Sequence, residues 1–234
     1  MTAQQINKHI RRLANREKAE ILKGFFKTGP GGYGEGDTFL GIQMPTIRQV
    51  EKKFWGTPLG EIKKLMKSPI HEGRLLALLM LVHLYAAGDG ALKQKIYDFY
   101  LKSTRYINSW DLVDLSAPNI VGKYLSDKSR KPIYVLAKSG DLWKRRIAIM
   151  ATFHFIKRDD FTDTLKISRL LIMDDHDLVH KAVGWMLREI GKRSLSALER
   201  FLKLHYKKMP RTMLRYAIER FPEDKRQRYL NGSI

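Results

Sequence analysis

The segment from Trp110 to Asp114 places an indole and a carboxylate four residues apart, so that both side chains share one face of a helix. A fixed carboxylate can stabilise a developing positive charge, and an indole offers its π face to a cation. Pro118 cannot donate an amide to the carbonyl of Asp114, and its ring pushes against that carbonyl, which predicts a kink in the helix there. A core Trp beside a surface Asp that pairs with Arg146 would give the same pattern, and the residues alone leave both interpretations open.

A second tryptophan has basic neighbours. Lys181, Trp185 and Arg188 follow one another at i, i+4 and i+7 and therefore lie on one helix face. A Trp between cations is typical of a stacking platform for nucleic acid, and equally of an interface Trp packed beneath its neighbours. Gly184 weakens the helix relative to Ala, which favours a close approach of another group to this face.

Two other patterns resemble a metal site and a dinucleotide site, but each lacks a required feature. His176 and His180 are four residues apart beside a run of Asp, but no third ligand is specified, and Asp before a helix is usually a cap. Gly29, Gly31 and Gly34 satisfy G-x-G-x-x-G without the preceding strand that a dinucleotide site requires. Cysteine is absent, which excludes thiolate sites. We therefore expect no metal and no cofactor.

The charge balance points to a polyanionic partner. The 234 residues carry 44 Lys and Arg against 24 Asp and Glu, a formal charge of +20 that is spread along the chain. Nucleic acid is the leading partner, ahead of an anionic membrane surface or an acidic protein. The N-terminus has no apolar run typical of a signal peptide, and the apolar stretch 75–87 is too short to span a bilayer. We expect a cytoplasmic monomer without membrane contact.

The elements that carry these residues are predicted to be helices throughout. Apolar residues recur at three- and four-residue spacing, and no segment alternates like a strand. Basic or aromatic residues near helix starts recur at 74, 110, 146, 181 and 215, at intervals of 36, 36, 35 and 34 residues. That period is typical of a helical-pair solenoid. The sequence therefore predicts one all-α domain over 1–234, a HEAT-like repeat solenoid of stacked antiparallel helix pairs with a concave basic face. Residues 1–70 would be N-terminal cap helices and 71–234 the repeats.

Four phrases carry a resemblance to a known family. They are WDLVDLSAPNIVG (110–122), LWKRRIAIM (142–150), KAVGWMLREIGK (181–192) and FLGIQMPTIRQ (39–49). Together they resemble the AlkD-like DNA alkylation repair proteins over nearly the whole chain. The resemblance implies a HEAT-like fold and a monofunctional glycosylase that removes positively charged alkylpurines from DNA. It also implies that the damaged base need not be fully flipped into a pocket.

The resemblance assigns site residues as well. It places the catalytic positions at Trp110, Asp114, Arg146 and Trp185, where Arg146 would hold a phosphate and keep Asp114 ionised. The family often has a Tyr near the end of its second helix, where this chain has Phe25, so that a hydroxyl contact is replaced by an aromatic surface alone. We expect the other DNA contacts to come from basic residues of the concave face: Arg74, Lys181, Arg188 and Lys192.

The implied chemistry fits a single carboxylate. Most glycoside hydrolysis needs two, one of which protonates the leaving group, but an N3- or N7-alkylated purine is already cationic. The function expected is excision of 3-methyladenine- or 7-methylguanine-type bases from duplex DNA in bacterial base excision repair, near the nucleoid. The alternative is a non-catalytic HEAT-repeat protein that recognises DNA structure or damage.

Overall fold

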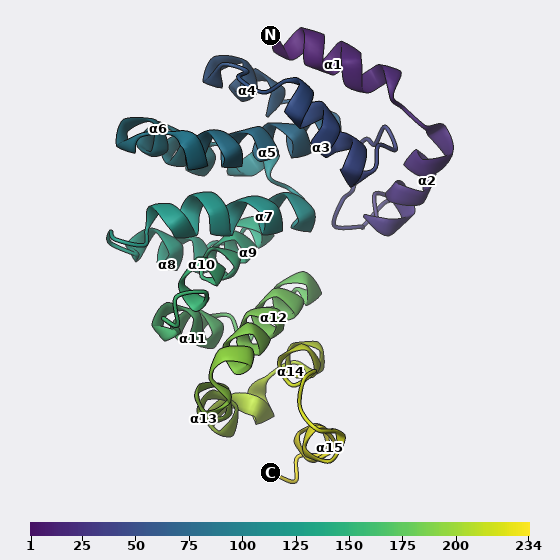
Figure 1. Cartoon of the computed structure of the whole chain (residues 1–234). Coiled ribbons are helices and arrows are strands. Elements are labelled where there is room, and N and C mark those ends of the chain that lie inside the picture. The colour runs from purple at the N-terminus through teal and green to yellow at the C-terminus, as the bar shows by residue number, and fades with distance from the viewer. The chain divides into compact units, whose positions relative to one another are not determined.

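The computed structural model describes residues 1–234 and consists of helices joined by loops, the longest of which links α2 to α3, with one isolated bridge between Thr38 and Ile70 (Figure 1). The all-α prediction is confirmed. The chain divides into two compact units, unit 1 (1–116) and unit 2 (117–234). No helix combines the length and apolarity that crossing a bilayer requires.

Unit 1 is built around one buried helix. Its α-helices, in chain order, are α1 (Ala3–Arg12), α2 (Arg16–Phe25), α3 (Met44–Lys53), α4 (Leu59–Leu65), α5 (His71–Ala87), α6 (Gly90–Lys102) and α7 (Trp110–Ala117). Helix α5 is apolar on nearly all sides and packs against α3, α4 and α6 (Figure 1). Asp89 caps α6 by accepting from the amide of Leu92, and the turn Gly88-Asp89-Gly90 joins α5 to α6.

A buried carboxylate at the start of α5 fixes the loop that precedes α3. Glu72 accepts hydrogen bonds from the amides of Leu40, Gly41 and Ile42 at 2.8 to 3.2 Å. Gly41 has a φ of +80°, and a Cβ there would stand 2.2 Å from the carbonyl oxygen of Asn15 in the loop before α2. The phrase FLGIQMP is thus a loop shaped to surround Glu72, and it joins α2, α3 and α5 in one structure.

Unit 2 consists of two helical layers. It begins with the π-helical turn Pro118–Gly122, followed by α8 (Lys131–Ala137), α9 (Leu142–Ala151), α10 (Phe153–Ile156), α11 (Thr162–Leu170), α12 (Asp177–Arg193), α13 (Leu195–His205), α14 (Arg211–Ala217) and α15 (Glu223–Asn231). Helix α12 packs against α9 and α14, while α8 packs against α9 and α11 against α12, to the left of them in Figure 1. The pairs α8–α9 and α11–α12 give unit 2 the repeat-type arrangement that was predicted.

The predicted repeat register holds within unit 2. Arg146, Lys181 and Arg215 are each the fifth residue of their helices, which begin at 142, 177 and 211. In unit 1 the register shifts, because the fifth residue of α7 is Asp114 and Trp110 is the first. Trp110 therefore stands one helical turn before the position at which unit 2 carries its cations.

Gly184 lies where α12 and α14 approach most closely. A Cβ built on it would stand 2.5 Å from the Met213 carbonyl oxygen and 2.5 Å from the Tyr216 Cβ. The close approach predicted for this face is therefore an approach of α14.

Gly184→Ala should destabilise the protein by about 1–2 kcal/mol, because overpacking against backbone costs more than the roughly 1 kcal/mol that Ala gains in a helix. The free energy of unfolding in urea measures the loss. Gly24→Ala is the matched control, since a Cβ there meets nothing within 4 Å and should bring a small gain. Equal stability of the two variants would contradict the packing argument.

Candidate functional site

Trp110 is held in a stack of aromatic rings in unit 1. Its indole lies parallel to Phe26 with ring centroids 5.3 Å apart, and Phe26 stacks on Phe39 at 5.0 Å. Phe25 meets the indole edge-on at 5.8 Å and has 61 % of its surface exposed. The aromatic surface expected at Phe25 is therefore present beside the candidate catalytic tryptophan.

A tyrosine that the sequence analysis did not single out completes the surroundings of Trp110. The indole Nε1 of Trp110 donates to Tyr33 Oη at 3.2 Å, and Tyr33 Oη donates to the carbonyl of Phe25 at 3.2 Å. Tyr33 belongs to the glycine-rich loop, in which a Cβ on Gly34 would stand 2.5 Å from the carbonyl oxygen of Phe26. The glycines thus allow the loop to fold back on α2 and place a hydroxyl at Trp110.

A buried charged network lies directly beneath this stack. His71 bonds Asp37 through Nδ1 at 3.0 Å and Asp111 through Nε2 at 2.8 Å, and Phe39 stacks on its ring at 4.4 Å. Burial works to lower the pKa of His71, but the hydrogen bonds and charges of Asp111 and Asp37 outweigh burial and raise it to about 9. His71 is therefore a cation at neutral pH, and it ties the first turn of α7 to α5.

Arg74 belongs to the same network, and its predicted role in binding DNA is wrong. Its Nη2 donates to both oxygens of Asp37 at 2.8 Å, its Nη1 donates to the carbonyl of Ser68 at 3.0 Å, and only 4 % of its surface is exposed. Burial works to raise the pKa of Asp37, but the hydrogen bonds and charges of His71 and Arg74 prevail and lower it. Arg74 therefore neutralises a buried carboxylate instead of a phosphate.

A cleft of about 510 Å³ opens beside Trp110 within unit 1. Aromatic and aliphatic side chains form most of its lining, and the network contributes Asp111 and His71. Oδ1 of Asp111 is buried without a hydrogen-bond partner. An unsatisfied carboxylate oxygen is costly, so that a ligand donor in this cleft would gain a hydrogen bond.

Asp114 follows Trp110 by one turn on α7 and is half-buried. Its negative charge adds to burial in raising the pKa of Tyr100, whose hydroxyl pairs with Ser116 Oγ at 2.9 Å. Helix α7 ends at Ala117, and Pro118–Gly122 form a π-helical turn at the proline where a kink is predicted. The candidate carboxylate thus lies in the last regular turn before a local distortion of the helix.

In unit 2, Trp185 is half-exposed on α12. Its Nε1 donates to Glu189 at 3.0 Å, and Phe153 lies 6.1 Å away, centroid to centroid. Glu189 also accepts from Lys192 at 2.6 Å. The predicted DNA contact Lys192 therefore shares a carboxylate with the candidate catalytic indole.

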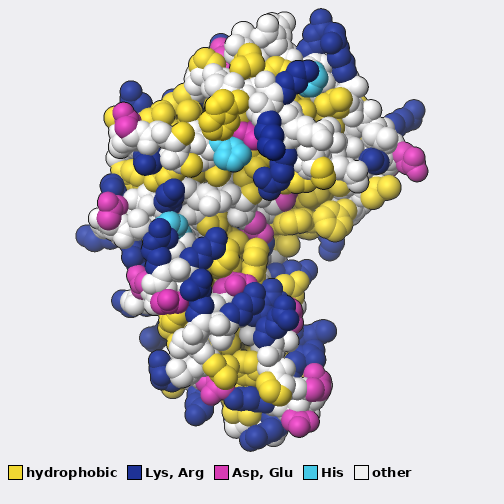
Figure 2. All heavy atoms as spheres, in the orientation of Figure 1, with side chains coloured by type: hydrophobic (Ala, Val, Ile, Leu, Met, Phe, Trp, Pro, Cys, Tyr) yellow, Lys and Arg dark blue, Asp and Glu magenta, His cyan; other side chains and the backbone are white.

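The remaining predicted cations of unit 2 all have partners within the unit. Lys181 pairs with Asp177 at 2.7 Å, and Arg188 pairs with Glu219. Arg146 is 4 % exposed and donates to the carbonyl of Leu178 on α12. The sequence predicts that Arg146 holds a phosphate, but the burial of its side chain argues against a direct contact. Lys and Arg side chains nevertheless cover much of the visible face of unit 2 (Figure 2).

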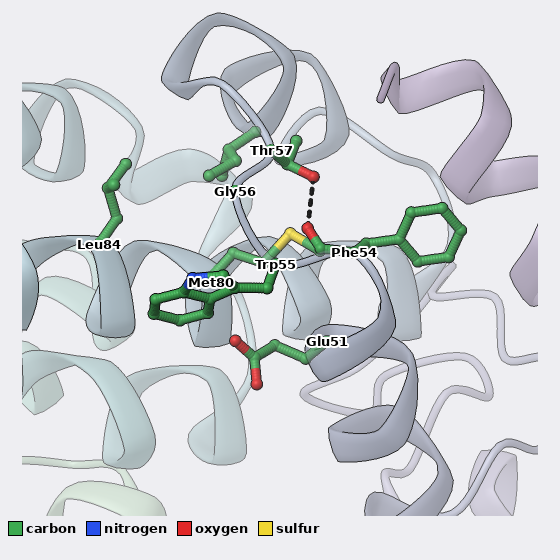
Figure 3. A pocket seen from close by; sticks show the side chains of 8 residues that line it. Glu51, Phe54, Trp55, Gly56, Thr57, Met80 and Leu84 are labelled. Atoms are coloured by element: carbon green, nitrogen blue, oxygen red, sulfur yellow. Dashed lines mark hydrogen bonds between the residues drawn. The ribbon is translucent and has the colours of Figure 1, made fainter.

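A smaller pocket of about 100 Å³ lies elsewhere in unit 1, between α3 and α5 (Figure 3). Apolar side chains line it, with Glu51 directed toward the indole of Trp55 (Figure 3). Glu51 is bound by His83 Nδ1 at 2.6 Å. None of the candidate site residues lines this pocket.

The His176 segment is a helix start, as predicted, although the cap is His176 itself and not an Asp. Its ring accepts from the amide of Leu178 at 3.1 Å. Arg145 on α9 forms an ion pair with Asp174, with Nε and Oδ2 2.5 Å apart. This ion pair joins the loop before α12 to α9. These side chains are accounted for by capping and pairing.

Residues 6–221 match the family described as DNA alkylation repair enzyme. The chain belongs to this family. A solved structure described as a predicted DNA alkylation repair enzyme from Enterococcus faecalis has the same fold, with a TM-score of 0.70 at 16 % identity over 90 % of this chain and 97 % of that one. No curated protein matches the sequence.

Family membership confirms the resemblance seen in the four sequence phrases and places the protein in DNA alkylation repair. The matched region contains Trp110, Trp185 and Asp114. A DNA substrate accords with the +20 charge of the chain.

Tyr33→Phe should slow any reaction that uses Trp110, because the indole loses the hydroxyl that holds its Nε1. One neutral hydrogen bond is worth about 1 kcal/mol, so that the single-turnover rate should fall roughly fivefold while DNA affinity changes little. Tyr106→Phe is the control, since its hydroxyl contacts only the exposed Arg105. Equal rates for the two variants would contradict a positioning role for Tyr33.

Proposed function

We propose that the protein is a monofunctional DNA glycosylase that excises positively charged alkylated purines by hydrolysing the N-glycosidic bond. The observation that carries the proposal is the α7 helix of unit 1, which presents the oriented indole of Trp110 and, one turn later, the half-buried carboxylate of Asp114. An indole and a carboxylate on one helix face suit a cation that develops during the reaction.

The reaction requires little beyond these two groups. A purine alkylated at N3 or N7 departs as a neutral base, which leaves an oxocarbenium-like sugar. Asp114 would stabilise that sugar by its charge and orient the attacking water. Trp110 would offer its π face to the cationic lesion, an interaction worth about 0.5–2 kcal/mol.

The surroundings of Trp110 support this role. The Phe25 ring and the adjoining cleft offer apolar surface against which a deoxyribose or base edge can pack. The network of His71 and Asp111 anchors the first turn of α7, and therefore the indole that begins it. Reaction geometry depends on such fixed supports, since a small displacement costs catalysis heavily.

Release of free base from methylated duplex DNA tests the proposal. Wild-type protein should liberate 7-methylguanine or 3-methyladenine and leave an abasic site without cutting the strand. DNA binding without any base release would overturn the proposal and favour a non-catalytic protein that recognises DNA structure or damage.

A further inference from the structure

A second group of cations lies on the other helical layer of unit 2. Lys138, Lys166 and Arg169 line an open cleft of about 540 Å³ between α8 and α11, together with Tyr134 and Leu170. All three basic side chains are exposed. We call these five residues the α8–α11 cleft.

The cations of the α8–α11 cleft have no counter-ions. No acidic residue lines the cleft, and none of its three cations forms an ion pair. The acid nearest to Tyr134 is Asp163, which accepts from the Tyr134 hydroxyl at 2.5 Å and is neutralised by Arg130, also at 2.5 Å. The charge of the cleft therefore remains available to an anion from solution.

The cations predicted to bind DNA on α12 differ in this respect. Lys181, Arg188 and Lys192 are each paired with a carboxylate. A phosphate at those positions must compete with an existing ion pair, whereas a phosphate in the α8–α11 cleft displaces only water and counterions.

The positive field extends beyond the cleft toward the end of α13. Burial, followed by the charges of Arg169 and Lys208, lowers the pKa of His205. Lys208 lies in the short helix after α13 and forms no ion pair either. The positive charge of the cleft thus continues from Arg169 to the end of α13, which suits an extended polyanion.

We propose that the α8–α11 cleft binds the phosphodiester backbone of a second DNA segment, independently of the candidate site on α7. The guanidinium of Arg169 can donate to two phosphate oxygens, and the two lysines add point charges. DNA is favoured over an acidic protein because the chain belongs to a DNA repair family. One molecule would then hold two duplexes, or two parts of one bent duplex.

The stoichiometry of binding to a short undamaged duplex of about one helical turn tests this proposal. At low salt, wild-type protein should bind two duplexes, and the triple variant K138A/K166A/R169A only one. The weaker phase of wild-type binding should show a log–log salt slope of about −2 to −3, the value for two or three phosphate contacts. That phase should be absent from the variant.

The control variant K23A/K64A/K128A removes the same net charge from exposed lysines that are paired with acids. It should still bind two duplexes. If both triple variants lose the second duplex, the proposal is overturned, because the loss then follows from net charge alone. If neither variant loses it, the proposal is also overturned, and an acidic protein is left as the occupant of the cleft. Base release is measured on the same preparations, so that an inactive wild-type protein that binds two duplexes would overturn the proposed glycosylase activity alone.

Discussion

Asp114→Asn should reduce the single-turnover rate of base release by about 10²-fold or more, the scale expected when one preorganised electrostatic group is lost. The substitution keeps the size of the side chain and removes its charge. DNA affinity should hold steady or rise, because a negative charge facing phosphates disappears. Release of 7-methylguanine, measured beside a binding titration, separates the effect on rate from the effect on affinity.

Asp98→Asn on α6 serves as the control for the loss of one negative charge in unit 1, since Asp98 is exposed and bonds only Gln94. It should release base at the wild-type rate. If Asp114 were only structural, its variant would instead lose stability and affinity together, which a melting curve detects. An unchanged rate in a folded D114N protein would rule out catalysis by this carboxylate.

The stability of the protein should fall by roughly 3 kcal/mol as the pH rises, because the pKa of His71 is raised from 6.5 to about 9 in the folded state. A raised pKa means that the folded state holds the proton more tightly than the unfolded state. The stabilisation is therefore complete below pH 6.5 and is lost as the pH passes about 9. His71→Gln should remove this dependence, so that the difference in unfolding free energy between the two proteins shrinks across the interval.

His9→Gln is the control for this measurement. Burial and the charges of Lys53 and Arg12 lower the pKa of His9, so that it is uncharged in both states above about pH 7. Its pH profile should run parallel to that of wild type between pH 7 and 9. A wild-type profile that is flat over the same interval would show that His71 is not held as a cation.

The helical architecture could be predicted from the sequence because its determinants are local. The spacing of apolar residues, the Asp89 cap and the interruption at Pro118 each act within a few residues. The repeat register of unit 2 could be predicted from a period in the sequence, since Arg146 and Lys181 occupy the same position in α9 and α12.

The inward orientation of Arg74 could not be predicted, because its partner Asp37 lies 37 residues away in a loop without periodicity. Tyr33 was missed for the same reason, since 77 residues separate it from Trp110. A buried residue pair of this kind leaves no local spacing pattern. The one local signal is the charged start of α5, where His71, Glu72 and Arg74 precede a long apolar run.

The hydrogen bonds from the loop before α3 to Glu72 should affect the rate of hydrogen exchange. The amides of Leu40, Gly41 and Ile42 lie outside any helix, yet they donate to a carboxylate that is 1 % exposed. Hydrogen exchange at such amides requires the acceptor to be uncovered, and here that means separating the loop from α5. This irregular segment should therefore open only with the core of unit 1 and exchange its protons as slowly as the buried helix does.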